Sequence, residues 1–272
     1  MDKKNIAIVT GASSGIGKEF LILLLKEQGL DELWAIGRNE ERLKEVKEND
    51  KDRIRTFSMD LTDRRNLDVL EALITSEDVN IKWLVNCAGY AKFCDYGGID
   101  RFTSINMIDL NVSALVAMGL ICLPYMERGA HIINMASQAS FQPLPYQNIY
   151  SSTKAFVRNY TRALNVELRS KGVVATAVCP GWMQTRLIER AIVEGEKGTR
   201  VFPHIVYPEV VAKKALKDAK KFKDISIYGA YTKLTHVIAK MLPQRCMMGI
   251  WLKQQRLSDV SSTKSTASEE RN

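Results

Sequence analysis

The sequence has few cysteines and no grouping of them that could build a site. Its five cysteines stand far apart, at positions 87, 94, 122, 179 and 246, and no two form a Cys-x-x-Cys pair. An odd number at such spacing speaks against both a disulfide framework and a zinc site. We therefore expect no metal, and we expect a reducing, cytoplasmic compartment.

Long hydrophobic runs are also missing. The apolar run at residues 6–9 is too short for the core of a secretory signal, and no small-residue cleavage site follows it. The longest weakly polar stretch, residues 113–126, falls short of the ~18–20 apolar residues that cross a bilayer. We expect no export, and we expect a buried helix over residues 113–126.

What the chain does have is the composition of a folded domain. Its 272 residues are 46% hydrophobic, with 39 basic and 31 acidic side chains and a formal net charge of +8. This composition excludes a disordered or collagen-like chain and allows one large core. Residues 213–257 hold eleven basic and two acidic side chains, so the positive charge is local. We expect a single domain over residues 1–257 and a disordered tail over residues 258–272, where hydroxyl and charged side chains dominate.

Short β-rich runs alternate with longer helical patterns, and such alternation is typical of βαβ units around a parallel sheet. Strands are expected at residues 6–9, 32–36, 54–58, 82–86, 131–135, 173–178 and 226–228. Helices are expected at residues 15–28, 40–48, 64–76, 105–127, 149–170, 184–195, 208–222 and 230–241. The first and fifth strands are apolar on both faces, which predicts helices on both sides of the sheet. The expected fold class is α/β, doubly wound, with a mainly parallel sheet of seven strands.

A glycine-rich turn follows the first strand and opens the first helix. The turn consists of Thr10, Gly11, Ala12, Ser13, Ser14, Gly15, Ile16 and Gly17. Glycines at such a junction let backbone N–H groups approach a nucleotide pyrophosphate. The spacing G-x-x-x-G-x-G differs from the common G-x-G-x-x-G, and glycines at a strand–helix junction can also serve the turn alone.

The second strand ends in Arg38 and Asn39, at the place where a bound dinucleotide would present its adenosine ribose. An acidic residue there would favour NAD, whereas a guanidinium matches a 2′-phosphate. No acidic residue follows before Glu40. The sequence therefore favours NADP(H), and the alternative is a solvated arginine at a strand end.

Four polar side chains are candidates for catalysis. Tyr150 and Lys154 are four residues apart, so a helix places them on one face, where the lysine would favour the phenolate form of the tyrosine. Ser137 follows a strand, at the edge where open α/β sheets bind ligands. Asn111 interrupts an apolar helical run, which asks for a structural or functional reason. Taken one by one, each also has an ordinary explanation as a cap or a chance spacing.

Together these motifs resemble those of the short-chain dehydrogenase/reductase family. The resemblance rests on the glycine turn, Asn86-Cys87-Ala88-Gly89, Asn111, Ser137, Tyr150 with Lys154, and Pro180-Gly181-Trp182-Met183-Gln184-Thr185, in order over residues 5–187. It implies a Rossmann-like domain that performs reversible carbonyl reduction.

By this resemblance, four side chains form the catalytic set. Tyr150 donates a proton to the carbonyl oxygen and Ser137 orients that oxygen. Lys154 lowers the pKa of the tyrosine and holds the nicotinamide ribose, while Asn111 anchors a proton relay through water. The residues implied in cofactor binding are Thr10, Gly11, Ser13, Ser14, Gly15, Ile16, Gly17, Arg38, Asn39, Asp60, Leu61, Asn86, Ala88, Gly89, Tyr150, Lys154, Pro180, Gly181, Met183 and Thr185. Cys87 departs from the family pattern, in which a second asparagine is common.

The substrate side is expected to be large and apolar. Its expected residues are Ser137, Phe141, Leu144, Tyr146, Gln147, Tyr150, Trp182 and Leu187. Such a wall suits a bulky hydrophobic ketone, in the manner of a hydroxysteroid dehydrogenase acting on a steroid or bile acid. A 3-oxoacyl thioester reductase and a non-catalytic nucleotide-binding regulator remain alternatives.

The basic segment at residues 230–257 extends beyond a minimal fold and is expected to cover the substrate cleft. Its mix of apolar and cationic side chains could recognise an anionic substrate or lie on an acidic membrane surface, or it could be a solvated helix face. No specific nucleic-acid binding is expected. Members of the family commonly associate through their long central helices, so we expect a dimer or tetramer.

Overall fold

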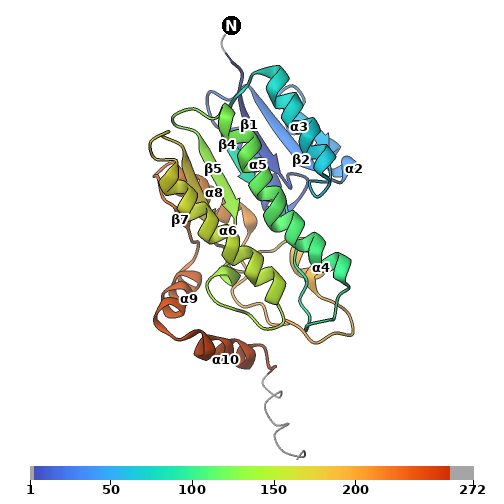
Figure 1. The fold of residues 1–272 in the computed structure, drawn as a ribbon, viewed down its shortest axis with the longest axis vertical. Helices are drawn as coiled ribbons and strands as arrows, with labels where there is room; N and C mark the ends of the chain where they lie inside the picture. The colour runs from blue at the N-terminus through green and yellow to red at the C-terminus, as the bar shows by residue number, and fades with distance from the viewer. Residues whose placement is uncertain (1–2, 258–272) are drawn as a thin grey trace, which may run out of the picture.

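The computed structural model describes residues 3–257, so the tail expected at residues 258–272 lies outside the described residues. Its strands are β1 (Asn5–Thr10), β2 (Glu32–Gly37), β3 (Ile54–Ser58), β4 (Asn80–Asn86), β5 (His131–Met135), β6 (Val174–Val178) and β7 (Ile225–Ser226). They form one seven-stranded parallel sheet in the order β3-β2-β1-β4-β5-β6-β7 (Figure 1). The predicted α/β fold with a parallel sheet of seven strands is confirmed.

The described residues contain ten α-helices, of which α1 to α8 lie between strands and α9 and α10 follow the last strand. They are α1 (Gly15–Leu24), α2 (Glu40–Lys47), α3 (Arg64–Glu77), α4 (Arg101–Ile108), α5 (Ala114–Cys122), α6 (Asn148–Glu167), α7 (Arg186–Ala191), α8 (Pro208–Ala219), α9 (Ala230–Met241) and α10 (Gln244–Gln254). The sequence pattern did not predict α10. The helix expected over residues 184–195 is shorter, because Ile192 leaves it to form a β-bridge with Phe93.

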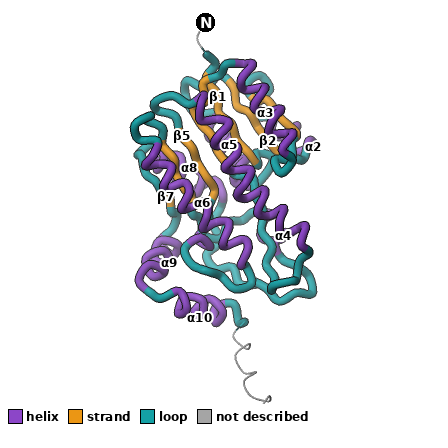
Figure 2. The backbone as a smooth tube through the Cα atoms, in the orientation of Figure 1, coloured by secondary structure: helices purple, strands orange, loops and turns teal. Residues whose placement is uncertain are grey.

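Alternating side chains of the strands build a separate core on each face of the sheet. Ala7 and Val9 of β1 point into the core beneath α1, α2 and α8, whereas Ile6 and Ile8 point into the core beneath α3, α5 and α6. Figure 2 shows the orange strands enclosed between helices on both sides. Side chains of a strand alternate between the two faces of the sheet, so the apolar run at residues 6–9 is what a strand buried on both faces requires.

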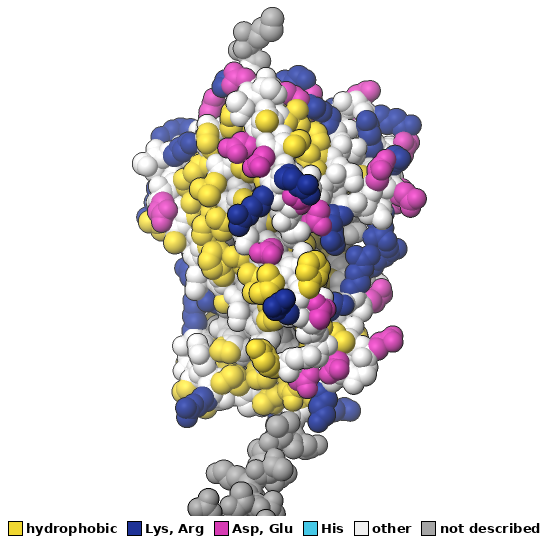
Figure 3. Space-filling view, turned by 45° about the vertical axis from the view of Figure 1, so that its right-hand side comes forward, with side chains coloured by type: hydrophobic (Ala, Val, Ile, Leu, Met, Phe, Trp, Pro, Cys, Tyr) yellow, Lys and Arg dark blue, Asp and Glu magenta, His cyan; other side chains and the backbone are white. Residues whose placement is uncertain are grey.

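The helices α4 and α5 belong to one continuous helix from Arg101 to Tyr125, which crosses one face of the sheet. It is the one helix of the described residues long and apolar enough for a membrane span. Its most apolar 18-residue stretch has a mean hydropathy of 1.8, and half of that stretch is buried inside the protein. Its inner side packs on the sheet, as expected for residues 113–126. Its outer side exposes Phe102, Ile105 and Leu120, and hydrophobic side chains gather in a band down one half of the face in Figure 3. Association through this helix stays a prediction.

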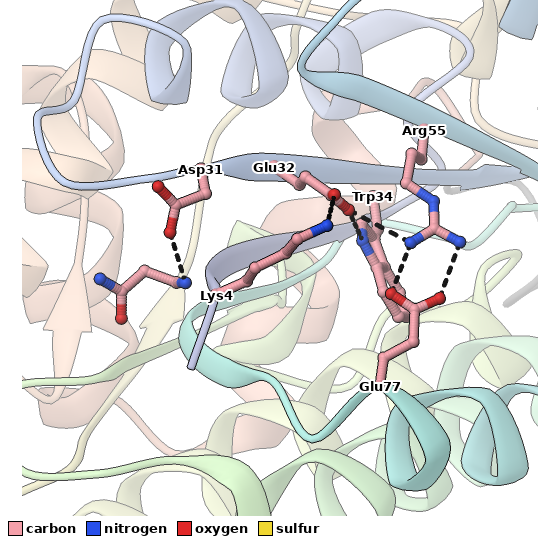
Figure 4. Close-up of polar contacts among 7 residues, drawn as sticks. Lys4, Asp31, Glu32, Trp34, Arg55 and Glu77 are labelled. Atoms are coloured by element: carbon pink, nitrogen blue, oxygen red, sulfur yellow. Dashed lines mark hydrogen bonds and ion pairs between the residues drawn. The ribbon is translucent and has the colours of Figure 1, made fainter. Parts of the chain in front are cut away.

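Hydrogen bonds between charged side chains link the amino ends of β1, β2 and β3 (Figure 4). Glu32 accepts hydrogen bonds from Lys4, at 2.5 Å, and from Trp34, at 3.1 Å. Arg55 donates to Glu32, at 3.2 Å, and through two nitrogens to Glu77, at 2.7 and 2.9 Å. Partial burial pushes the pKa of Glu32 upward, but these hydrogen bonds outweigh it and leave the pKa lowered. The polar candidates of the sequence lie at the opposite, carboxyl edge of the sheet.

Candidate active site

The glycine turn leaves the backbone exposed between β1 and α1. Gly11 has a φ of +67°, and a Cβ on it would stand 2.9 Å from the backbone nitrogen of Ala88. A Cβ on Gly17 would stand 2.3 Å from the carbonyl oxygen of Gly11. Side chains at either position would therefore force the turn away from β4 or away from the first turn of α1.

The amino end of α1 fits an anion. Ser14 is the N-cap residue, but its side chain makes no capping hydrogen bond, and the first turn holds no acidic residue. The unpaired N–H groups and the helix dipole therefore face a groove lined by Gly11, Ser13, Ser14, Gly15, Ile16 and Gly17. This arrangement fits the pyrophosphate of a dinucleotide.

Basic side chains outnumber the acidic Glu19 and Glu45 in the lining of this groove. A dinucleotide would place its adenosine near the end of β2. Arg38 was expected there, and the structure adds Lys18 and Arg42 to the lining. The Arg38 side chain is 61% exposed, and its Nη1 lies 3.5 Å from an oxygen of Asp60. Asn39 caps α2 by accepting a hydrogen bond from the Arg42 N–H, at 2.9 Å. The surplus of positive charge suits a phosphate on the ribose better than a free hydroxyl.

Two residues behind the wall of the groove hold its backbone in place. The Thr10 hydroxyl accepts hydrogen bonds from the N–H groups of Cys87 and Ala88, at 3.1 and 3.2 Å, and so fixes the end of β4 beside the glycine turn. The buried Asn86 donates to the Asn134 side chain, at 2.9 Å. Neither Thr10 nor Asn86 lines the groove. Both residues instead support the backbone of the residues that line the groove.

Tyr150 and Ser137 meet in the lining of a second pocket. Tyr150 lies in the first turn of α6 and Ser137 follows β5, and both line the pocket. Burial raises the pKa of Tyr150, and a hydrogen bond with Ser137 offsets only part of this effect. The net pKa of Tyr150 is therefore raised, because burial prevails, and the lowering expected from Lys154 stays a prediction. The phenol is protonated at neutral pH and can donate a proton.

Lys154 lies one helical turn beyond Tyr150, on the same face of α6. Its ammonium group donates a hydrogen bond to the carbonyl oxygen of Met135, at 2.7 Å, and stands 5.8 Å from the centre of the Tyr150 ring. Burial lowers the pKa of Lys154 from 10.5 to about 8. A lysine held in this way keeps a positive charge close to the tyrosine at neutral pH.

The hydrogen bonds of Asn111 explain why an asparagine interrupts an apolar helix. It lies in a π-helical turn, Asp109–Ser113, between α4 and α5. Its side chain accepts a hydrogen bond from the Tyr90 N–H, at 3.0 Å, and donates to the Tyr90 carbonyl, at 2.9 Å, and to the Thr153 hydroxyl, at 3.2 Å. A Cβ on Gly89 would lie 2.7 Å from Asn111 Oδ1 and 3.6 Å from Lys154 Nζ. The glycine therefore leaves open the space between these two polar groups.

The groove and the pocket share a wall. Their common lining residues are Ile16, Cys87, Gly89, Tyr90, Met183, Thr185 and Leu187. A molecule laid along the groove can therefore extend one end into the pocket beside Tyr150. Burial raises the pKa of Cys87 well above that of a free thiol, which disfavours the reactive thiolate form.

The pocket brings together most of the residues expected for substrate, but not all. Ser137, Leu144, Gln147, Tyr150, Trp182 and Leu187 line it, as do Pro180, Gly181, Met183 and Thr185, which were expected for the cofactor. Phe141 does not, because its ring packs against His236 of α9, with centroids 4.3 Å apart. Tyr146 lines neither cleft. Asp60 does not line the groove either, since its carboxylate accepts hydrogen bonds from Thr62, at 3.0 and 2.8 Å, while its neighbour Leu61 lines the groove.

Other lining residues were missed by the sequence reasoning. They are Gln138 and Gln142 after β5, Ile188 of α7, Tyr231 and Thr235 of α9, and Trp251 and Gln254 of α10. The basic segment does form part of the pocket wall. The signal that could have found α10 is the spacing of four between Met247 and Trp251, the two residues it buries. Within residues 3–257, no three His, Cys, Asp or Glu side chains are grouped to hold a metal ion.

Comparison with protein families agrees with this geometry. A family model described as short chain dehydrogenase matches residues 5–194. An uncharacterized oxidoreductase of Staphylococcus epidermidis is 34% identical over 192 residues, which cover 69% of this chain and 81% of the relative. An uncharacterized oxidoreductase of Staphylococcus aureus is 34% identical over 188 residues, which cover 67% and 79%.

Solved structures share the fold. A short-chain dehydrogenase of Sphingobium yanoikuyae in complex with NADPH superposes with a TM-score of 0.72 at 25% identity, covering 97% of this chain and 99% of that one. A serine dehydrogenase complexed with NADP+ gives a TM-score of 0.69 at 28% identity, covering 82% and 94%. A short-chain dehydrogenase of Streptomyces avermitilis gives 0.73 at 21% identity, covering 95% and 100%.

Proposed function

The chain belongs to the short-chain dehydrogenase family, and from this premise we propose that it uses NADP(H) to reduce, reversibly, a ketone on a bulky hydrophobic substrate. Membership of the family makes it an NAD(P)-dependent oxidoreductase. The observation that carries the proposal is the wall shared by the nucleotide groove and the pocket, with Tyr150 and Lys154 lining the pocket. A dinucleotide in the groove would reach the substrate there.

The chemistry assigns each polar side chain a part. The nicotinamide, when bound, supplies the hydride that adds to the carbonyl carbon. Tyr150, kept protonated by burial, donates its proton to the carbonyl oxygen, so the C=O bond becomes CH–OH. Ser137 offers its hydroxyl to that oxygen, and Lys154 keeps a positive charge beside the phenolate that forms. Asn111 holds the backbone at Tyr90, and Gly89, which lacks a side chain, leaves space between Asn111 and Lys154 in which a water could return the proton.

A preference for NADP(H) over NAD(H) is supported by Arg38, which follows β2 and lines the groove together with the cations Lys18 and Arg42. Replacing Arg38 with Asp should weaken NADPH binding at least tenfold and change NADH binding little, since only NADPH carries the 2′-phosphate. The matched control is Arg169→Asp, which alters an exposed arginine just beyond α6. Titration of each variant with both nucleotides measures the ratio. An unchanged ratio in Arg38→Asp would remove this support for NADP(H).

The pocket walls favour a large hydrophobic substrate that carries hydrogen-bond donors. Leu144, Trp182, Leu187, Ile188 and Trp251 contribute apolar surface. The side-chain oxygens of three glutamines in the lining, Gln138, Gln142 and Gln147, are buried and have no hydrogen-bond partner within the described structure. Buried oxygens without donors are costly, so hydroxyl groups on a substrate would gain affinity by reaching them. A steroid or bile acid has this combination of a rigid apolar body and hydroxyl groups.

The first experiment is a substrate screen that follows loss of NADPH absorbance. Purified protein should reduce ring ketones of steroids or bile acids, and hydroxylated members should react faster than deoxy analogues by about fivefold to tenfold. Activity that instead follows acyl chain length would favour the alternative, a 3-oxoacyl thioester reductase. Tyr150→Phe should lose most turnover and keep NADPH binding, because it removes the proton donor alone. Binding of NADPH without turnover of any ketone by the unmodified protein would favour a regulator.

A further inference from the structure

The helices α9 and α10 each have an outer face that nothing in the described structure covers. On α9 this face carries Leu234, Val237 and Met241, at the spacing of one helical stripe, with exposures of 59%, 51% and 77%. Leu242, at the elbow between the helices, and Ile250, on α10, are also exposed, at 39% and 51%. We call these five side chains the outer apolar face. Figure 1 shows the two helices projecting from the end of the molecule farthest from the amino terminus.

Basic side chains flank the outer apolar face, and acidic ones are absent from the two helices. Residues 230–257 contain no Asp or Glu and five cations, Lys233, Lys240, Arg245, Lys253 and Arg256, all of them exposed. None of the five forms an ion pair within residues 3–257. An apolar stripe with cations beside it is the pattern of a helix that lies in a membrane interface.

The inner faces of α9 and α10 line the pocket and attach both helices to the rest of the domain. Tyr231 and Thr235 of α9 line the pocket, and the Trp251 indole of α10 donates a hydrogen bond to the Pro145 carbonyl, at 3.0 Å. Gln255, just after α10, accepts hydrogen bonds from the N–H groups of Arg200 and Val201, both at 3.0 Å. The outer apolar face is therefore presented by helices whose opposite sides are held in place.

We infer that the outer apolar face docks the protein on an anionic lipid surface. Two other covers fit the face poorly. A second copy in a twofold pair would bring the same five cations against one another, which is unfavourable. Residues 258–272 offer only Val260 and Ala267 as hydrophobic side chains to cover five. A lipid surface with acidic headgroups supplies both an apolar layer and negative charge. The docking does not depend on which reaction the pocket performs.

The test is co-sedimentation of the full chain with lipid vesicles. The protein should bind vesicles of phosphatidylcholine that contain about one-third phosphatidylglycerol at least tenfold more tightly than vesicles of phosphatidylcholine alone. Val237→Asn with Met241→Asn should lower binding to the anionic vesicles at least tenfold. Lys233→Gln with Lys240→Gln should lower it about tenfold and should reduce its sensitivity to salt.

Matched controls distinguish docking through the outer apolar face from nonspecific binding to vesicles and from unfolding of the variants. Lys213→Gln with Lys217→Gln removes two exposed lysines four residues apart on α8, and Val69→Asn removes an exposed valine on α3. Both should bind as the unmodified protein does. Every variant is first checked for an unchanged unfolding temperature, and a variant that fails is replaced by Leu234→Ser or Ile250→Ser.

A second readout uses the exposed Cys246 at the start of α10. An environment-sensitive dye on this thiol should shift to shorter wavelength when anionic vesicles are added. The inference is overturned if vesicles cause no shift and no sedimentation, or if the α8 variant lowers binding as much as the α9 variant. It is also overturned if Val237→Asn with Met241→Asn turns a dimer into a monomer and leaves vesicle binding unchanged, which would make the face a contact between copies.

Discussion

Replacing Lys154 with Met should make the protein more stable at neutral pH while stopping its reaction. Lys154 is buried, and burial lowers its pKa from 10.5 to about 8. The folded state therefore holds a charged group at a cost that the unfolded chain does not have. Methionine fills similar space without charge.

The size and the sign of the effect follow from this shift. A pKa lowered by this amount corresponds to about 3 kcal/mol of unfavourable free energy at any pH below about 8, where both states carry the proton. As the pH rises from about 8 toward 10.5, the folded state releases its proton first, so the stability of the unmodified protein increases. Losing the hydrogen bond to the Met135 carbonyl costs the variant about 1–3 kcal/mol at every pH. We expect Lys154→Met to be about 1 kcal/mol more stable near pH 7 and less stable near pH 10.

The assay is urea unfolding of both proteins near pH 7 and near pH 9.5. The difference between their free energies of unfolding should move by about 2 kcal/mol in favour of the unmodified protein, because all other titrating groups are common to the two. Lys26→Met, which alters an exposed lysine after α1, is the control and should show no such movement. A difference that does not change with pH would refute the argument that Lys154 is buried as a charged group. Turnover should be lost in Lys154→Met at both pH values.

Two further predictions concern the backbone turn and the charged edge of the sheet. Gly17→Ala should weaken NADPH binding at least tenfold and lower stability by about 1–3 kcal/mol, because its Cβ would stand 2.3 Å from the Gly11 oxygen; nucleotide titration and thermal unfolding measure both. Arg55→Met should cost about 1–2 kcal/mol near pH 7, since it leaves Glu32 and Glu77 without their shared partner, and the loss should shrink as the pH falls through the lowered pKa of Glu32. Acid titration of the unfolding free energy checks the second, and a loss that is constant with pH would contradict it.

The sheet could be predicted because each strand carries its own signal. β1 and β5 are apolar at successive positions, and in a parallel sheet such a strand is buried on both faces. The candidate reaction site could be located for a related reason. The glycine turn, Ser137 and the residues from Pro180 onward all follow strands, and the carboxyl ends of parallel strands meet at one edge.

The features that could not be predicted depend on contacts between distant parts of the chain. The helix around Asn111 widens into a π turn because its amide bonds both backbone groups of Tyr90, 21 residues away. Phe141 follows Ser137 closely and was expected in the pocket, yet it packs against α9. The place of α10 depends on the hydrogen bond from Trp251 to Pro145, which is 106 residues away in the sequence. A sequence pattern covers only neighbouring residues, so it cannot show contacts between residues this far apart.

The residues proposed for catalysis and part of the pocket wall therefore lie in different parts of the chain. The family match ends at residue 194 and contains every residue of the candidate catalytic set. The pocket wall beyond it is supplied by Tyr231, Thr235, Trp251 and Gln254, on helices that the sheet does not position. The same helices carry the outer apolar face and its cations. The part of the chain beyond the family match therefore contributes both to the pocket wall and to the surface that we propose as the lipid-docking face, so substrate screening and vesicle binding both probe these two helices.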